Sequence, residues 1–320
     1  MFDAQRKLMN WTTVKNPLFE SGPNDDFAKF HLEFTNAQPP QELFHYTSEE
    51  NVLNIVRFGN LWATECTYLN DESELQAGIN IFREELQKFA DNIFVNLINA
   101  ALNKWNENSW MCFVISLSEH GDLLSQWRAY AKDGTGCSLA LDAVCIKNRA
   151  GFGEHVGIDP DALPSETSNF YHLLKVVYDK DRKQEIARQF LQHAKKQFDE
   201  FRLAGGNDNE TFVLLFWWRM KEFLISFKND NFSEEREWRV VSSLYCSDPA
   251  IDFRYTSYGV SPYVKVNLSP RDHIMSSRLP ITRIVLGPRN ATKLNQKGLV
   301  LFLERMNCKA SIAASLSPYR

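Results

Sequence analysis

The stretch NFSEEREWRVV, residues 231–241, leads into a predicted β-strand and carries two glutamates where strands disfavour them. Side chains alternate between the two faces of a strand, so Glu235, Glu237 and Arg239 are expected on one face. Trp238 and the following alternate valine are expected on the opposite, buried face. The glutamate face therefore borders either open water or a cleft.

Two interpretations of this glutamate pair predict different proteins. In the first, Glu235 and Glu237 lie on a solvated strand surface, where Arg239 pairs with Glu237 and adds little stability. In the second, they lie in a cleft, where a carboxylate stabilises the positive charge that develops when a sugar is transferred through an oxocarbenium-like state. The spacing of the glutamates fits both.

The composition is that of a globular protein. The chain has 320 residues, of which 44% are hydrophobic and 24% charged, a balance typical of a folded protein with a large core. Its formal net charge of −4 gives no bulk attraction to nucleic acid or to an anionic membrane. A local basic groove is compatible with that value.

The cysteines and the apolar stretches indicate a reduced, cytoplasmic protein. The 6 cysteines are scattered, without the paired spacing of a zinc site or the density of a disulfide framework, so neither a metal site nor disulfides are expected. The beginning of the chain lacks the apolar segment of a secretory signal. The most apolar stretch, residues 212–227, contains Arg219, Lys221 and Glu222, which predicts a buried or amphipathic helix rather than a membrane span.

Mixed strand and helix patterns predict an α+β fold. Residues 1–41 are weakly patterned and are expected to form an N-terminal extension, and residues 42–320 a single domain. Two long helical patterns predict a helical insertion near residues 181–228, and residues 143–168 are expected to form a loop. The last strands follow one another without helices between them, which favours a mixed, mostly antiparallel sheet with helices packed around it.

The block FHYTSEENV, residues 44–52, combines a histidine with a helix start. Thr47 and Glu50 have the spacing of a capping box, so a helix is expected to begin there. His45 lies in the strand just before it. It is either a histidine packed under the helix start or, with the free backbone N–H groups of the helix N-terminus, part of a site for an anionic ligand.

A second polar block, VISLSEHGDLLSQWRAYAKDGTG at residues 114–136, begins in a predicted strand. Ser116 and Ser118 alternate along this strand and share a face, from which both hydroxyls could reach a ribose. Trp127 and Tyr130 lie three residues apart on a short predicted helix and project from one side of it. That spacing fits a core pair or a ligand clamp.

A further polar cluster, YLNDESE at residues 68–74, is explained by helix capping alone. Asp71 and Glu74 have the spacing of another capping box. No site role is therefore expected for this cluster.

In their order, these blocks resemble the uncharacterised bacterial family known as domain-of-unknown-function family 2971. The resemblance rests on FHYTS…NVLNIV…LWAT…YLNDESE, CFVISLSEHGDLLSQWRAYAKDGTGCSLALD, EEREWRVV and ITRIVLG, which together extend over about residues 42–290. Membership of this family implies a fold more than an activity.

The same order of blocks also resembles that of mono-ADP-ribosyltransferases. In addition, HYTSEENVLNIVRFG is similar to the opening block of DNA-modifying ADP-ribosyltransferase toxins. The resemblance implies an ADP-ribosyltransferase-like fold with NAD as the substrate. His45 and Thr47 would then hold NAD, and Ser116, with Ser118 on the same strand face, would shape the nicotinamide pocket.

The resemblance also implies roles for the aromatic pair and for the late glutamates. Tyr130 or Trp127 would stack on the nicotinamide ring. Glu237 would be the catalytic residue that stabilises the ribosyl cation, and Glu235 would orient the acceptor. The unfavourable strand glutamates would then be a cost of function.

A protein of this kind would be an intracellular enzyme, such as a toxin or phage-defence effector, without a membrane partner. It would transfer ADP-ribose to a macromolecule, protein or nucleic acid, and an antitoxin or defence-system partner would be expected. The first block has His where the arginine-modifying branch has Arg, whereas the late block has the E-x-E of that branch, so the acceptor stays open. The alternative is a catalytically inactive module of the same fold that binds a nucleotide or a protein.

Overall fold

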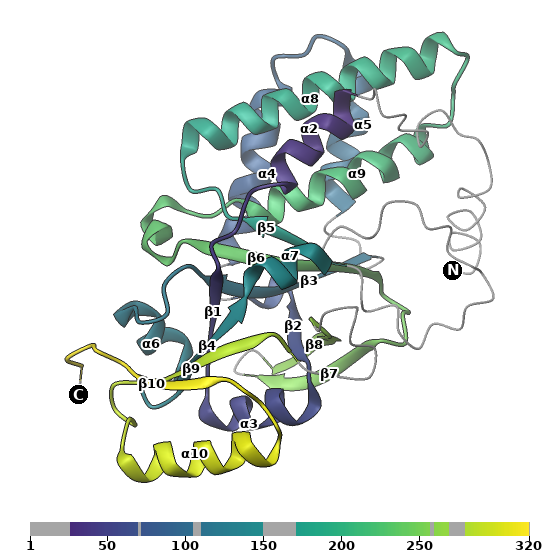
Figure 1. Cartoon of the computed structure of the whole chain (residues 1–320). Coiled ribbons are helices and arrows are strands. Elements are labelled where there is room, and N and C mark those ends of the chain that lie inside the picture. Colours follow the sequence, from purple (N-terminus) through teal and green to yellow (C-terminus); the bar gives the residue numbers. More distant parts are fainter. Residues whose placement is uncertain are drawn as a thin grey trace.

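The protein has an α+β fold built on one mixed, mostly antiparallel sheet with helices around it (Figure 1), as the sequence predicts. The computed structural model describes residues 26–69, 72–104, 110–149, 171–256, 259–268 and 279–319. The strands are β1 (Glu42–Thr47), β2 (Leu61–Glu65), β3 (Trp110–Ser118), β4 (Cys137–Asp142), β5 (His172–Lys175), β6 (Glu237–Tyr245), β7 (Ile251–Thr256), β8 (Gly259–Val266), β9 (Ile281–Leu286) and β10 (Ser311–Ala314). The helices are α2 (Asp26–Thr35), α3 (Glu49–Phe58), α4 (Glu72–Leu86), α5 (Asn92–Asn103), α6 (Leu124–Tyr130), α7 (Ala143–Arg149), α8 (Lys180–Leu203), α9 (Asn209–Ser226) and α10 (Lys293–Arg305), with 3₁₀ turns η1 (Cys66–Tyr68) and η4 (Asp230–Glu235).

Strand β3 is the branch point of the sheet. The main path runs β10-β9-β4-β1-β3-β2-β8-β7, and β6 pairs with both β3 and β5. β6 follows β3 from Trp110 to Ser118 along one side. On the other side, β3 pairs with β2 at Val114 and with β1 only at Ser118. Two strands therefore share one side of β3 and diverge from each other between these two positions.

The helices gather in a layer at one end of the molecule, whereas α3 and α10 lie at the other end (Figure 1). The layer consists of α2, α4, α5, α8 and α9, which surround an aromatic core that includes Phe82, Phe190 and Phe223. Phe27 of α2 is buried in the same core, so the described part of the predicted N-terminal extension packs into the main body. The predicted helical insertion near residues 181–228 corresponds to α8 and α9.

Polar side chains set two helix boundaries that the sequence patterns placed differently. Residues 143–168 were expected to form a loop, but α7 begins at Ala143 because the Asp142 carboxylate accepts hydrogen bonds from the next two free backbone N–H groups, each at 3.0 Å; residues 150–168 lie outside the described part. The cap of α3 is Ser48 rather than Thr47. Ser48 Oγ accepts a hydrogen bond from the backbone N–H of Asn51 at 3.2 Å.

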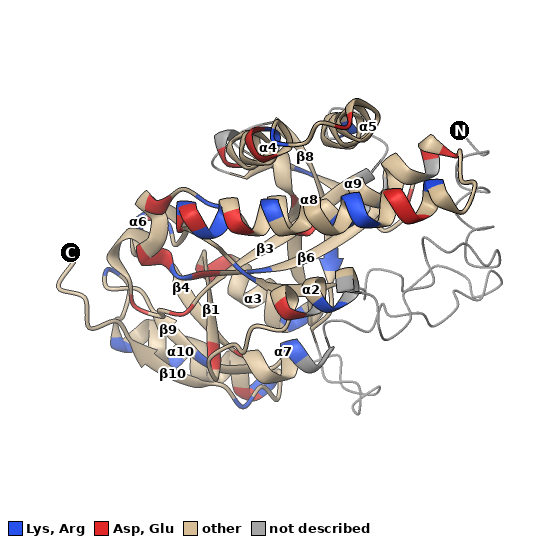
Figure 2. Ribbon diagram, turned by 90° about the horizontal axis from the view of Figure 1, so that it is seen from above, with Lys and Arg blue, Asp and Glu red and all other residues tan. Residues whose placement is uncertain are grey.

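Charge is mixed along the helical layer. Seen from above, Lys and Arg alternate with Asp and Glu along α8 (Figure 2). An alternating face of this kind keeps the helix solvated without creating a field of one sign. The face of α8 seen in this view therefore does not indicate a site for a partner of one strong charge.

Candidate functional site

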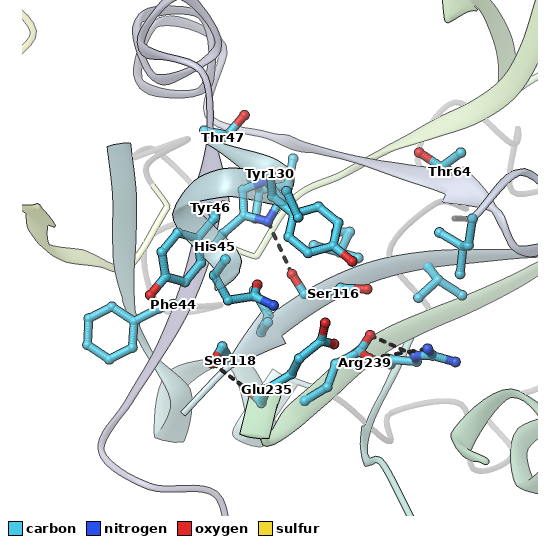
Figure 3. A pocket seen from close by; sticks show the side chains of 18 of the residues that line it. Phe44, His45, Tyr46, Thr47, Thr64, Ser116, Ser118, Tyr130, Glu235 and Arg239 are labelled. Atoms are coloured by element: carbon cyan, nitrogen blue, oxygen red, sulfur yellow. Dashed lines mark hydrogen bonds and ion pairs between the residues drawn. The ribbon is translucent and has the colours of Figure 1, made fainter. Parts of the chain in front are cut away.

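A cavity of about 750 Å³ opens where the sheet branches (Figure 3). Ser116 lies on β3 between Val114, which pairs with β2, and Ser118, which pairs with β1. Along its other edge β3 pairs with β6, where Ser116 is opposite Arg239. The divergence of β1 from β2 thus exposes the middle of β3, and Ser116 is solvent-accessible there.

His45 of β1 reaches across the opening. Its Nδ1 lies 3.2 Å from the carbonyl oxygen of Ser116 (Figure 3), so Nδ1–H donates and Nε2 is left as an acceptor in the neutral ring. Burial lowers the pKa of His45, the hydrogen bond to Ser116 opposes that effect in part, and the positive charge of Arg254 adds to it. We conclude that His45 is neutral at pH 7 and satisfies a β3 carbonyl that no strand covers.

Five charged side chains form one wall of the cavity and are called the cavity cluster: Glu74, Lys228, Glu235, Glu237 and Arg239. Lys228 Nζ lies 2.6 Å from Glu235 Oε2 and 2.9 Å from Glu237 Oε2. Arg239 donates from Nε to Glu237 Oε1 at 2.8 Å and from Nη2 to Glu74 Oε2 at 2.9 Å. Three carboxylates thus face two cations, and the ionised cluster carries a net negative charge.

The two glutamates reach this cluster from different elements. Glu235 is the last residue of η4, Arg236 has a positive φ of 41°, and β6 begins at Glu237. The prediction that both glutamates lie on one strand face is therefore wrong, because the turn at Arg236 separates them. Two hydrogen bonds hold this turn: Ser118 Oγ donates to the Glu235 carbonyl at 2.7 Å, and the Glu237 N–H donates to Tyr178 Oη at 2.8 Å.

The interpretation of the glutamates as a solvated surface is also wrong. Glu235, Glu237 and Arg239 are only 7%, 4% and 4% exposed. Trp238 is completely buried on the other face, as the alternation predicts. Because an unpaired buried charge is strongly unfavourable, the ion pairs of the cluster are required for these residues to be inside at all.

The environment pushes the pKa values of the two glutamates in opposite directions. Burial alone would raise the pKa of Glu237, but the positive charges of Arg239 and Lys228 outweigh it and lower that pKa to about 2. Burial raises the pKa of Glu235, and its contact with Lys228 offsets this only in part. Glu237 is therefore a permanent negative charge, whereas Glu235 takes up a proton more readily.

Glu235 is also the glutamate that is better placed to meet a ligand. Its carboxylate points into the cavity toward Ser116 (Figure 3). Within the part of the chain that the structure describes, only Oε2 accepts a hydrogen bond, and the donor is Lys228. Both oxygens of Glu237, in contrast, accept hydrogen bonds from Arg239 or Lys228.

Most of the residues singled out in the sequence meet at this cavity. His45, Thr47, Ser116, Ser118 and Tyr130 all line it. The hydroxyls of Thr47 and Ser118 already have hydrogen-bond partners in the protein. Thr47 Oγ1 accepts from the side-chain amide of Asn51 at 3.0 Å, and Ser118 Oγ donates to the Glu235 carbonyl. The ring of Tyr130, which is 37% exposed, points into the cavity (Figure 3).

Trp127 does not line the cavity, so its expected stacking on a nicotinamide ring needs correction. It is completely buried and packs edge-on against Tyr46, with ring centroids 4.9 Å apart. Its indole Nε1 donates to Asp122 at 2.6 Å. Side chains three residues apart on an α-helix differ by about 60° in direction, so Tyr130 of α6 lines the cavity whereas Trp127 is in the core.

Sequence patterns missed several charged residues of the cavity, among them Glu74, Lys228 and Arg254. Glu74 was attributed to helix capping, Lys228 follows the apolar helix α9, and Arg254 lies on β7, a strand that the patterns did not predict. Lys228 stands two residues after α9, behind the largely apolar run FLISF at residues 223–227, and this was the one available signal, because such a residue is close to buried surface. Nothing in their local sequence connects Glu74 or Arg254 with the glutamates of the late block.

Residues 126–240 match the family described as "Protein of unknown function (DUF2971)". The matched segment runs from α6 to β6, so it contains Glu235 and Glu237 but neither His45 nor Ser116. It is shorter than the resemblance over residues 42–290 expected from the sequence. No curated protein and no solved structure matches the chain at a significant level.

Within the described residues, no group of three or more His, Cys, Asp and Glu side chains is arranged to hold a metal ion. None of the helices in the described ranges is long and apolar enough to cross a membrane.

Proposed function

We propose that this protein transfers ADP-ribose from NAD⁺ to an acceptor, with the cavity as its active site. One observation carries the proposal: the three sequence blocks that resemble mono-ADP-ribosyltransferases lie on β1, β3 and β6, which are successive neighbours in the sheet. Their side chains His45, Ser116, Glu235 and Glu237 line the same cavity. Blocks with purely local roles have no reason to converge in this way.

The charges of the cavity suit the chemistry of this transfer. The bond between the nicotinamide nitrogen and C1′ of the ribose breaks, the electron pair leaves with neutral nicotinamide, and positive charge develops on the ribose. Glu237, with a pKa of about 2, and the net negative cavity cluster stabilise that charge. A nucleophilic group of the acceptor then forms the new bond to C1′, and Glu235, whose pKa is raised, accepts the proton that this group releases.

A second candidate, binding of a nucleotide or protein without turnover, is favoured by the contacts of Glu237. Both of its oxygens accept hydrogen bonds from Arg239 or Lys228, which reduces the negative field that reaches a ligand. In this case the cavity cluster is a structural network that shapes a binding site, and NAD⁺ stabilises the protein without being cleaved.

Nicotinamide release from NAD⁺ by the purified protein, with and without cell lysate, separates the two candidates. We expect release that rises with lysate and falls at least about 100-fold in Glu235→Gln and in Glu237→Gln, because each removes a charge that acts at the reacting ribose. Glu304→Gln, which removes an exposed carboxylate on α10, is the matched control and should keep wild-type activity. Unchanged release in both cavity variants would contradict the assignment of the glutamates. Thermal stabilisation by NAD⁺ without any release would favour the binding module.

Treating the lysate before the assay identifies the class of acceptor. If the acceptor is a nucleic acid, nuclease treatment abolishes the stimulation and protease treatment preserves it. A protein acceptor gives the opposite pattern. Stimulation that survives both treatments would exclude a macromolecular acceptor.

A further inference from the structure

Arg254 lies at the cavity on the side away from the cavity cluster and is held there unusually firmly. Its Nη2 donates to Thr64 Oγ1 at 2.5 Å. The guanidinium carbon lies 5.4 Å from the ring centroid of Trp62 and 5.5 Å from that of Tyr263, so two aromatic rings flank the cation. Both Arg254 and Thr64 line the cavity.

The cation is nevertheless incompletely satisfied. Its Nε is buried and lacks a hydrogen-bond partner. Across the described ranges, no carboxylate forms an ion pair with Arg254, in contrast to Lys228 and Arg239, which are each paired with at least two glutamates. An unpaired cation that lines a cavity is unfavourable unless water or a ligand supplies an acceptor there.

The position of the guanidinium relative to the glutamates indicates the shape of that ligand. Thr64, its hydrogen-bond partner, belongs to β2, and β2 and β6 lie on opposite sides of β3. Thr64 pairs with Val114 of β3, whereas Glu237 pairs with Ser118, so the backbone of Thr64 is two strand spacings and four residues along β3 away from that of Glu237, roughly 15 Å. The cavity is negative at the β6 side and positive at the β2 side, which fits a ligand with a ribose at one end and an anionic group further along.

We propose that Arg254 is a phosphate-binding residue and that the cavity takes the diphosphate of a nucleotide against it. A guanidinium presents several donors in a fixed plane, which suits the oxygens of a phosphate group. Thr64 and the two flanking rings hold this plane toward the cavity. The identity of the ligand as NAD⁺ rests on the proposed function, whereas the anion site rests on the geometry of Arg254 alone.

The alternative is that Arg254 only braces β7 and β8 against β2. A brace predicts that substitution lowers the stability of the protein and weakens every ligand of the cavity to a similar extent. A phosphate-binding residue predicts a loss that is confined to ligands with phosphate groups. Comparing ligands with and without phosphates therefore separates the two roles.

Isothermal titration of the full chain with ADP-ribose, ADP and adenosine tests the assignment. We expect Arg254→Gln to weaken ADP-ribose and ADP at least about tenfold, to leave adenosine within twofold, and Arg254→Lys to restore part of the affinity. Lys265→Gln is the matched control, because Lys265 is an exposed cation that contacts the same Tyr263 ring from outside the cavity. It should bind all three ligands as the wild type does.

Three results would overturn the proposal: wild-type protein that binds neither ADP nor ADP-ribose, equal affinity for ADP in wild type and Arg254→Gln, or an equal loss for ADP and adenosine. Failure of the transferase is distinguishable from these. Arg254-dependent binding of ADP without nicotinamide release retains the anion site and rejects the transfer reaction. Nicotinamide release whose KM and kcat are unchanged in Arg254→Gln retains the reaction and rejects the anion site.

Discussion

In the described part of the chain, two clusters of ionisable side chains lie near the C-terminal half of α9, the cavity cluster and a closed cluster of His31, His172 and Glu222. In the closed cluster, Glu222 accepts hydrogen bonds from His31 at 2.7 Å and from His172 at 2.5 Å, so each carboxylate oxygen is paired with a ring nitrogen. None of these three residues lines the cavity. The cavity cluster, in contrast, has more carboxylates than cations, and Glu235 keeps one oxygen without a described donor.

The comparison shows why burial of a carboxylate does not by itself mark a functional site. Burial alone would raise the pKa of Glu222, but His172 and His31 outweigh it and hold that pKa well below its usual range. Arg239 and Lys228 lower the pKa of Glu237 in the same way. What distinguishes the cavity cluster is Glu235, whose pKa is raised and whose carboxylate points toward open space.

The largest expected effect tests whether the cavity cluster holds its part of the fold together. Arg239→Met removes the cation shared by Glu237 and Glu74 and leaves both carboxylates buried with Lys228 alone. We expect the free energy of unfolding to fall by about 3–5 kcal/mol in urea titrations. Arg236→Gln, which removes an exposed arginine 3.7 Å from Glu119, should cost less than about 1 kcal/mol. Similar losses in the two variants would show that the cluster is not a buried network.

The next effect concerns the stability of the protein at acidic pH. The pKa of Glu237 is about 2 in the folded protein and 4.5 as its ordinary value, so the folded state binds this proton less readily than the unfolded state. The stabilisation from Glu237 is then complete above about pH 5 and is lost as the pH falls toward 2, by up to roughly 3 kcal/mol. Urea unfolding between pH 6 and pH 3 measures the slope, and Glu237→Gln should flatten it. A slope equal to that of the wild type in this variant would contradict the depressed pKa.

A smaller effect on stability, without an effect on activity, is expected when the closed cluster is changed. Glu222→Gln removes the charge between His31 and His172, and we expect a loss of about 1–3 kcal/mol in the free energy of unfolding. ADP-ribose affinity and nicotinamide release should stay within twofold of the wild type, because these residues lie outside the cavity. A selective loss of binding or release in folded Glu222→Gln would remove the distinction between the two clusters.

The smallest effect on stability should come from Glu235→Gln, which should not destabilise the protein as the other variants do. Because burial raises the pKa of Glu235 in the folded state, its ionised form is disfavoured by folding, and stability from this group falls as the pH rises through that pKa. The neutral amide avoids this cost and still offers an oxygen to Lys228. We therefore expect a change within about 1 kcal/mol at pH 7, neutral or stabilising. A loss as large as that of Arg239→Met would make Glu235 a structural residue.

Alternation and capping patterns in the sequence were sufficient for many of the elements, though not for β7 or α7, and for part of the site. They predict β1, β3 and β6 and the buried side of Trp238. Such features depend on residues two to four positions apart. The same local patterns placed Glu235 on a strand, because they contain no sign of the left-handed turn at Arg236.

By itself, the sequence determined which side chains were candidates, since His45, Ser116, Glu235 and Glu237 stand out within their own blocks. Only the tertiary structure decided their partners. Arg239 meets Glu74 across 165 positions, and the guanidinium of Arg254 rests on Thr64 across 190 positions. Charge pairing in a protein interior depends on distance in space, and the branching of the sheet at β3 sets those distances, which no local pattern encodes.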